Sequence, residues 1–404
     1  MAGRREFLKS APLAAAALFA SRNRLAADRT HGENGSSEGG LARRKLGRTG
    51  LMISEVSLGG SPLPDWPLFL ELIEKGVNYI DTSVSYDNGN SERQIGGMLK
   101  TLGRDKAFVA TKFHLRDNRS ESSIIASVEA SLKRLQTEPI DVLLIHGAEN
   151  PADLTDEPVL SAFDKMQKAG KFRFKGFSCH ANHAAMVRRA VDCGRYDMIQ
   201  LGYNVFDIDR PEQDPRTYTD YMADSGLREL LRLAAANGVG VIAMKTLKIG
   251  GRRQKLEAYR TGTATLQQAM LKWVLEDRNA TSAVTEILNR TQMEEDLAVI
   301  GAPLTAGERR MLYAHVAENS SEVCRGCAAC RKSCPAAIPT TDMLRSLAYI
   351  RNYGKSGRAR EAWAECGGGQ ALATCRDCGT CERVCRHGLP VRRLLREAAT
   401  LLDA

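Results

Sequence analysis

Short apolar segments alternate with longer amphipathic ones along most of the chain, from residue 43 onward. The apolar segments are rich in β-branched and aromatic residues and predict eight strands, at residues 53–58, 77–80, 107–111, 142–145, 172–177, 196–199, 239–244 and 282–285. Helical periodicity predicts eight helices, at residues 67–75, 92–100, 120–135, 157–168, 182–193, 227–237, 266–275 and 291–300. Eight strand-helix repeats favour an α/β fold, a (β/α)8 or TIM barrel. A doubly wound open sheet is the alternative.

Polar residues directly follow six of these predicted strands: Asp81, Lys112, His146, Ser178, Gln200 and Lys245. A buried strand rarely ends at a polar or charged residue unless that side chain faces a cavity. Because the carboxyl ends of barrel strands meet at one rim, we expect these side chains to line a site there. Residues 43–52, which contain two glycines, predict a hairpin that closes the opposite end of the barrel.

The length and charge of the chain indicate two domains and no nucleic-acid partner. A chain of 404 residues has room for one large and one small domain. Its net charge is +9, but the basic residues are scattered and aromatic residues are only 6%, so we expect a solvated basic surface and no nucleic-acid partner. Arginines at residues 358–360 and 392–396 are candidates for docking an acidic redox partner protein.

The first residues resemble a twin-arginine export signal. Arg4 and Arg5 precede a weakly apolar run at residues 11–20, and a polar stretch follows at residues 28–40. We expect a signal at residues 1–27, a linker at 28–42, and export to the periplasm or another extracytoplasmic space. The apolar run is too short to span a bilayer, so a membrane is involved only if the signal stays uncleaved. A short amphipathic helix is the alternative.

Nine of the eleven cysteines follow residue 320, and eight of these form two regular runs. Each run has the spacing C-x-x-C-x-x-C-x-x-x-C of a bacterial 4Fe-4S ferredoxin, in which three thiolates hold one cluster and the fourth reaches the other. We therefore predict two 4Fe-4S clusters in a small α-helical, ferredoxin-like iron-sulfur domain at residues 319–404. One cluster takes Cys324, Cys327, Cys330 and Cys385, and the other takes Cys375, Cys378, Cys381 and Cys334. Zinc is the alternative metal, although its usual paired knuckles do not match this spacing.

Residues between the two cysteine runs, and the three cysteines outside them, carry separate predictions. Residues 340–373 predict two helices with a glycine-rich break at 367–369. Cys366 has no assigned role. Cys179 and Cys193 are expected to pack in the barrel.

Four segments, taken in order, resemble the aldo-keto reductase family. They are residues 44–51, residues 77–96 around Asp81 and Tyr86, residues 110–112 ending at Lys112, and residues 141–146 ending at His146. The resemblance covers residues 43–318. It implies a barrel enzyme that uses NADP or NAD to reduce a small carbonyl compound or to oxidise the matching alcohol.

Chemistry explains why these four residue types belong together. A hydride that reaches a carbonyl carbon leaves an alkoxide, so a positioned acid must supply a proton, and we assign that role to Tyr86. A free phenol has a pKa near 10, and the ammonium of Lys112 lowers it. Asp81 orients Lys112 and offsets its buried charge. His146 supplies a second donor to the substrate oxygen.

The resemblance also implies a set of nucleotide contacts. They are Ser178, Gln200, Met244, Lys245, Leu247, Glu295 and Asp296. Asp296 departs from the Asn of the family. Glu286 and Gln292 stand where many members carry basic residues for a 2'-phosphate, so the choice between NADP and NAD stays open.

A second hypothesis assigns the chain a different class of function. In it the barrel docks or senses, and the clusters carry electrons to a redox partner. Direct electron transfer between a nicotinamide in the barrel and the clusters is difficult, because nicotinamide transfers two electrons as hydride while a 4Fe-4S cluster accepts one.

Overall fold

The structure is a computed structural model that describes residues 40–115, 119–207, 226–248 and 264–403. The expected twin-arginine signal and most of the expected linker lie outside the described residues. The described residues all belong to one compact unit that begins at Gly35. Among them, no helix is both long and apolar enough to cross a membrane.

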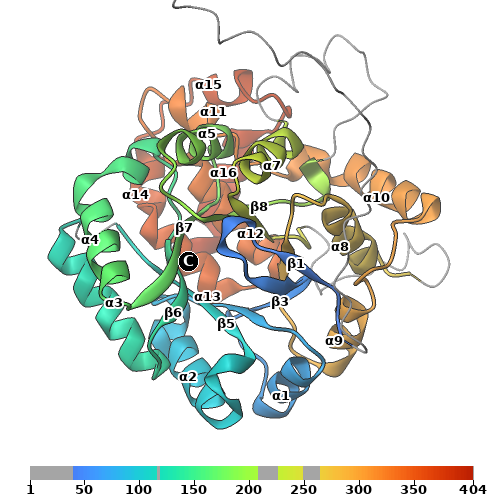
Figure 1. Ribbon diagram of the computed structural model, residues 1–404. Coiled ribbons are helices and arrows are strands. Elements are labelled where there is room, and N and C mark those ends of the chain that lie inside the picture. Colours follow the sequence, from blue (N-terminus) through green and yellow to red (C-terminus); the bar gives the residue numbers. More distant parts are fainter. Residues whose placement is uncertain (1–39, 116–118, 208–225, 249–263, 404) are drawn as a thin grey trace, which may run out of the picture. The chain divides into compact units, whose positions relative to one another are not determined.

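Eight parallel strands close into a barrel in the order β10-β3-β4-β5-β6-β7-β8-β9 (Figure 1). The fold class predicted for residues 43–318 is therefore confirmed. The strands are β3 (Val56–Gly59), β4 (Tyr79–Asp81), β5 (Phe108–Phe113), β6 (Ile140–Ile145), β7 (Phe172–Cys179), β8 (Met198–Gly202), β9 (Gly240–Met244) and β10 (Ser282–Thr285).

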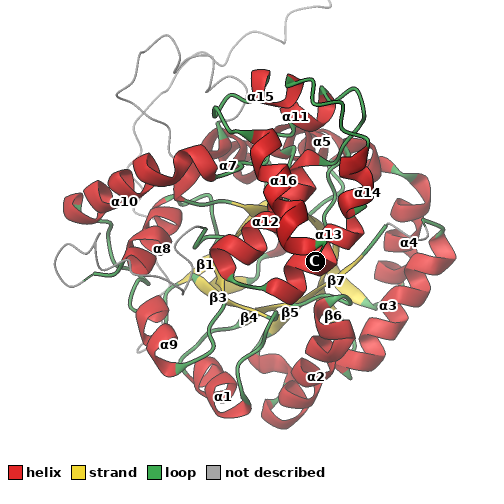
Figure 2. Ribbon diagram, turned by 180° about the vertical axis from the view of Figure 1, so that it is seen from behind, coloured by secondary structure: helices red, strands yellow, loops and turns green. Residues whose placement is uncertain are grey.

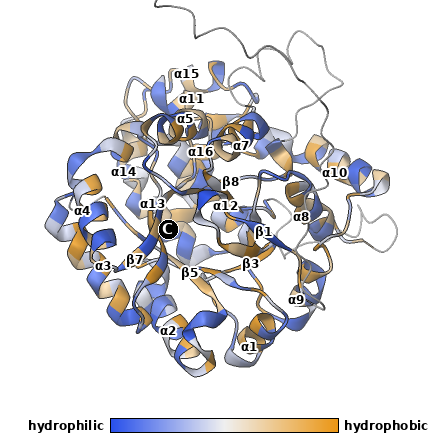
Figure 3. Ribbon diagram, viewed as in Figure 1, coloured by the Kyte–Doolittle hydropathy of each residue, from blue (hydrophilic) through white to orange (hydrophobic). Residues whose placement is uncertain are grey.

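Amphipathic helices surround the barrel, with their apolar faces toward the strands (Figure 3). They are α1 (Trp66–Glu74), α2 (Asn90–Leu102), α3 (Glu121–Leu135), α4 (Glu157–Lys168), α5 (His183–Cys193), α7 (Leu227–Ala236), α8 (Leu266–Glu276) and α9 (Arg290–Leu297). Helix α3 illustrates how the local sequence forms these helices. The Ser120 hydroxyl accepts a hydrogen bond from the Ser123 N–H and caps the helix, and Val128 and Leu132 lie one turn apart on its buried face.

The predicted strand at residues 53–58 is two strands in the structure. Its first part is β2 (Met52–Ser54), which pairs with β1 (Arg43–Lys45) in an antiparallel hairpin, and its second part is β3 of the barrel. Gly47 of this hairpin has φ +49°, and a Cβ there would lie 2.3 Å from the Gly240 nitrogen. The hairpin therefore packs against the amino end of β9 too closely for a side chain at this position.

Four barrel strands run further than the apolar pattern predicts. Asp81 pairs with Ala110, Lys112 pairs with Leu144, and Ser178 pairs with Gln200, so these polar residues are members of the strands. The physical reason is that main-chain pairing continues along the barrel wall regardless of side-chain polarity. The polar side chains are buried because they lie at the end of the barrel interior.

The C-terminal part of the chain is helical and contains its own small apolar core. After α10 (Ala306–Asn319) come α11 (Ala329–Lys332), α12 (Thr340–Tyr353), α13 (Ser356–Glu365), α14 (Gly368–Ala373), α15 (Thr380–Arg383) and α16 (Val391–Leu402). Trp363 and Leu394 are among the buried residues of this core. Residues 340–373 form three helices rather than two. The predicted glycine-rich break separates α13 from α14, and a second break at Gly354, whose φ is +57°, separates α12 from α13.

This helical domain contacts the carboxyl end of the barrel, and Figure 2 shows α12 and α13 in front of the strands. The Asn182 N–H donates to the Gly326 carbonyl at 2.9 Å. Arg331 pairs with Glu149 at 2.8 Å. The contact places the iron-sulfur motifs beside the rim where the strands end.

One buried ion pair ties the outer helices to the strand that carries Lys112. Glu92 of α2 is fully buried, and it accepts from Thr111 at 2.5 Å and pairs with Arg134 of α3 at 2.6 Å. Replacing Arg134 by Met leaves a buried carboxylate without its cation, so we expect the free energy of unfolding to fall by about 3 kcal/mol in denaturant titration.

Arg232→Met is the matched control, because Arg232 and Glu229 are both exposed. It should change the free energy of unfolding by less than about 0.5 kcal/mol. Equal effects of the two substitutions would contradict this description of the Glu92 site.

Candidate active site

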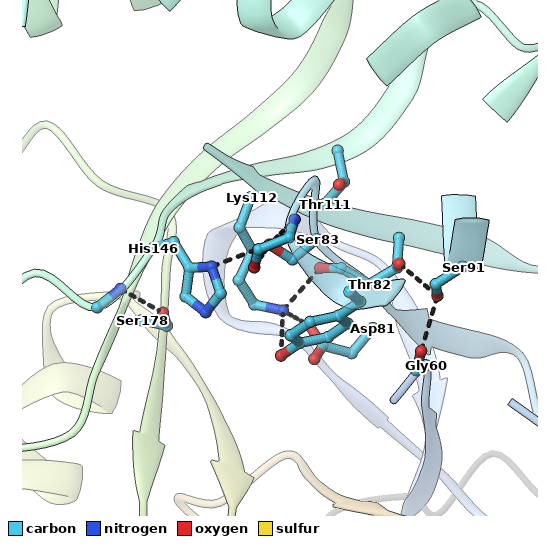
Figure 4. A network of polar contacts seen from close by, with 12 residues as sticks. Gly60, Asp81, Thr82, Ser83, Ser91, Thr111, Lys112, His146 and Ser178 are labelled. Carbon is cyan, nitrogen blue, oxygen red and sulfur yellow. Dashed lines mark hydrogen bonds and ion pairs between the residues drawn. The ribbon is translucent and has the colours of Figure 1, made fainter. Parts of the chain in front are cut away.

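A buried ion pair occupies the carboxyl ends of β4 and β5. Lys112 Nζ lies 2.6 Å from Asp81 Oδ1, and the two side chains are 1% and 4% exposed. The same ammonium donates to the Thr82 carbonyl at 2.7 Å (Figure 4). Two oxygens thus surround the ammonium, as a buried charge requires.

The phenol of Tyr86 is the third member of this group. Tyr86 begins the 3-10 turn η2 (Tyr86–Gly89), five residues after Asp81, and its hydroxyl lies 3.5 Å from Lys112 Nζ. Burial raises the pKa of Tyr86, and the positive charge of Lys112 lowers it. Asp81 and Tyr349 act to raise this pKa, and Arg358 acts to lower it. The phenol therefore stays protonated near neutral pH beside a cation that stabilises its conjugate base.

His146 lies on the other side of the phenol, directly after β6. Its Nδ1 is 2.9 Å from the Ser83 hydroxyl, and its ring meets the Tyr86 ring edge-on at 5.8 Å between centroids. The ring of His114 stacks on it at 4.3 Å. The structure thus brings Asp81, Tyr86, Lys112 and His146 to one place.

Two hydroxyls hold the turn between Asp81 and Tyr86 in position, and the sequence analysis assigned them no role. Thr82 and Ser91 share a hydrogen bond of 2.7 Å, and Ser91 donates to the Gly60 carbonyl at 2.7 Å (Figure 4). These bonds join β4, the β3 loop and α2. They fix the backbone from which Tyr86 extends.

A cavity of about 370 Å³ opens above this group. Its walls include Asp81 and Tyr86 and four of the predicted nucleotide residues: Gln200, Met244, Lys245 and Leu247. Glu286 and Gln292, which stand where many family members carry basic residues, also line it. Lys245 has φ +57°, which is uncommon for a residue with a side chain. The cavity is large enough to admit an organic ligand to the phenol.

Several buried polar atoms of the cavity wall have no hydrogen-bond partner among the described residues. They are Gln200 Oε1, His180 Nδ1, Thr285 Oγ1 and Tyr353 Oη. Buried polar groups are nearly always paired in folded proteins. Their convergence on one cavity indicates a polar ligand there, and the sequence analysis did not find His180 or Thr285.

Three predicted nucleotide residues do not line this cavity. Ser178 Oγ accepts from the Gly147 N–H at 3.0 Å and so supports the loop that carries His146. Glu295 accepts from the Thr265 hydroxyl, which also caps α8. Asp296 is fully buried in α9. These residues contact the protein itself in the structure.

The C-terminal domain supplies the remaining wall of the cavity. Tyr349 and Tyr353 of α12, Lys355 in the following turn and Arg358 of α13 all line it. The sequence indicated no role for the first three, and it named Arg358 only as a candidate for docking a redox partner. They become part of the site only because the helical domain packs on the barrel rim.

Eight cysteines surround two smaller cavities in that domain. One is lined by Cys324, Cys327, Cys330 and Cys385, and the other by Cys334, Cys375, Cys378 and Cys381. The grouping is the three-plus-one arrangement of the paired ferredoxin runs, and all these thiols are free of disulfides. Cys366 lines neither cavity. In the described residues, no three His, Cys, Asp or Glu side chains are arranged to hold a single metal ion.

Comparisons with known proteins agree with both halves of this description. The profile of the aldo/keto reductase family matches residues 68–263, and that of a 4Fe-4S dicluster domain matches residues 323–390. An aldo-keto reductase from Bacillus halodurans, solved in its holo form, is 24% identical with a TM-score of 0.54, over 68% of this chain and 96% of that one. That likeness shows the fold alone.

Two curated relatives complete the comparison. An uncharacterized oxidoreductase of Bacillus subtilis is 32% identical over 187 residues, or 43% of this chain and 59% of the relative, so the chain spans less than two thirds of it. An Escherichia coli protein named NADH-specific methylglyoxal reductase is 30% identical over 237 residues, or 51% of this chain and 67% of that protein. The chain belongs to the aldo/keto reductase family of oxidoreductases and carries a C-terminal 4Fe-4S dicluster-type domain.

Proposed function

We propose that this protein transfers a hydride between a nicotinamide nucleotide and a carbonyl or alcohol substrate at the mouth of the barrel. The observation that carries the proposal is the buried group of Asp81, Lys112 and Tyr86 beneath a ligand-sized cavity. When it is bound, the nucleotide supplies or accepts the hydride.

The side chains then carry out the proton transfer. As a hydride adds to the carbonyl carbon, the electron pair of the C=O bond moves to oxygen, and Tyr86 gives that oxygen its proton. Lys112 stabilises the phenolate that remains, and the phenolate takes a proton from solvent after the alcohol leaves. His146 lies beside Tyr86 and orients the substrate oxygen. The reverse sequence oxidises the alcohol.

Atoms of the barrel rim fit a nicotinamide group. Gln200 Oε1 is a buried acceptor without a partner among the described residues, and His180 Nδ1 lies in the same wall. Burial lowers the pKa of His180 well below its usual value, so its imidazole is neutral at pH 7. A carboxamide, with one acceptor and two donors, can satisfy both groups.

We also propose that each four-cysteine cavity holds one 4Fe-4S cluster. The protein supplies hydrogen bonds to the ligand sulfurs, such as the one from the Leu389 N–H to Cys385 at 3.4 Å. Cys327, Cys375 and Cys378 are exposed, which favours a second role in exchanging single electrons with a partner protein at the surface.

Removing the phenolic hydroxyl tests the proposed acid. In Tyr86→Phe we expect kcat for aldehyde reduction to fall by a factor of about 10² to 10⁴, because the alkoxide loses its proton donor. The Kd for the nucleotide, measured by fluorescence quenching, should change little. A variant that keeps most of its kcat would exclude Tyr86 as the acid.

The pH dependence tests the electrostatic role of Lys112. Reduction needs the protonated phenol and fails as pH rises through its pKa, whereas alcohol oxidation needs the phenolate and gains over the same range. The double variant Asp81→Asn, Lys112→Met removes the cation without leaving a buried carboxylate unpaired. The Tyr86 pKa should then rise, because the cation lowers it more than Asp81 raises it, and both pH-rate profiles should move to higher pH.

If the pH-rate profiles for reduction and oxidation do not change in the double variant, Lys112 does not lower the pKa of Tyr86. Tyr86→Phe made in the same background separates loss of the acid from general damage to the site.

Iron analysis tests the cluster assignment. Cys330→Ser should lower the iron and sulfide content of anaerobically purified protein by about half, because one ligand set loses a thiolate. Cys366→Ser is the matched control and should keep both clusters, since Cys366 lines neither cavity. Zinc in place of iron, or equal losses in the two variants, would contradict the assignment.

A further inference from the structure

The corner between α12 and α13 brings positive charge to the catalytic cavity. Lys355 and Arg358 of this corner line the cavity together with Lys245 of the barrel. The Lys355 charge is compensated by an ion pair with Glu286. The other two cations are arranged differently.

Lys245 is half-buried in the cavity wall, and no carboxylate among the described residues lies within 4 Å of its ammonium. Burial lowers its pKa to about 8, and the nearby Arg345 and Lys248 act in the same direction. Its nearest aromatic neighbour is Tyr349, whose ring centroid lies 5.2 Å from Nζ. A partly desolvated ammonium without a carboxylate partner gains from a bound anion.

Arg358 also lies over the Tyr349 ring, with its guanidinium carbon 5.7 Å from the centroid. It pairs through Nη1 with Glu361 and Glu365 of its own helix, at 3.1 and 3.3 Å. Arg358 and the Tyr86 phenol line the same cavity, so a ligand that reaches the phenol also passes the guanidinium. Tyr349 thus has two cations close to its ring in the wall of the cavity.

The lowered pKa of Tyr349 shows that the electrostatic potential at its hydroxyl is positive. Burial raises the pKa of Tyr349, but the charges of Lys245, Arg345 and Arg358 outweigh burial and hold it at about 8. The hydroxyl of Tyr353, one helical turn further along α12, is buried in the same wall with no partner among the described residues. Positive potential and an unused donor together favour an acidic ligand group.

We propose that Lys245 and Arg358 bind a carboxylate of the substrate, so that the enzyme acts on carbonyl or hydroxy compounds that carry an acid group. The inference rests on the proposed function and gives the iron-sulfur domain a direct part in substrate selection. A phosphate of the nucleotide is the other anion of similar chemistry. The position of Arg358 favours the substrate, because the nucleotide phosphates are separated from the reacting ring by a ribose.

Binding of a matched acid and ester tests this inference. The probes are 4-carboxybenzaldehyde and methyl 4-formylbenzoate, titrated by calorimetry into the full-length, cluster-loaded protein with oxidised nucleotide present, so that neither is reduced. We expect the acid to bind about tenfold or more tightly than the ester, because charge-assisted hydrogen bonds favour the carboxylate. Arg358→Gln and Lys245→Gln should each weaken acid binding about tenfold and ester binding less than twofold.

Conservative and distant variants serve as controls. Arg358→Lys should keep most of the preference for the acid. Arg351→Gln changes an arginine of α12 that pairs with Glu322 and Glu397, away from the cavity, and should keep it fully. The cluster absorbance of each variant reports whether the helical domain has folded.

Two results would overturn the inference. One is equal binding of acid and ester by the wild-type protein. The other is a loss of nucleotide affinity in both glutamine variants with acid binding unchanged, which would assign the two cations to a nucleotide phosphate. Failure of the proposed function looks different, because neither aldehyde would then be reduced with NADH or NADPH although the acid could still bind.

Discussion

The ion pair between Lys112 and Asp81 lies where two adjacent strands of the barrel end, and almost no water reaches it. An ammonium in such a place is stable only while its carboxylate is present, so neither residue can be changed alone without a large cost. In the proposed mechanism, the pair in turn stabilises the phenolate that Tyr86 forms when it gives up its proton. Hydroxyls of Thr82 and Ser91 and the buried Glu92 hold the surrounding backbone, so the outer helices help to set the geometry of the acid.

The helical domain forms part of the wall of the cavity at the barrel mouth. Its α12 begins beside one group of cluster ligands, where Thr340 meets Cys330 at 3.0 Å, and ends at the catalytic cavity with Tyr349 and Tyr353. A single helix thus links a cluster ligand to the wall of the active site. Folding of the domain around its clusters would therefore complete the substrate site, whatever electrons the clusters carry.

Much of this arrangement could be predicted from the sequence, because it depends on local patterns. Alternating strand and helix periodicity predicted the barrel, and regular cysteine spacing predicted the same grouping of thiols that lines the two cavities. Strand ends were predicted too early at Asp81 and Lys112, since backbone pairing ignores polarity. Tyr349 could not be found, and Arg358 was predicted only as part of a docking surface, because both join the site through packing between domains. Glu295 and Asp296 were assigned by resemblance alone, and they contact the protein rather than the cavity.

The central claim is that a hydride moves directly to the carbonyl carbon at the barrel mouth while Tyr86 protonates the oxygen. The most direct measurement is a reduction with nucleotide deuterated at the transferable position of the nicotinamide ring, followed by NMR of the alcohol product. The account predicts one deuterium on the carbinol carbon, with the hydroxyl proton taken from solvent. Solvent hydrogen on that carbon would contradict it, since the electrons would then have reached the substrate separately from the hydride.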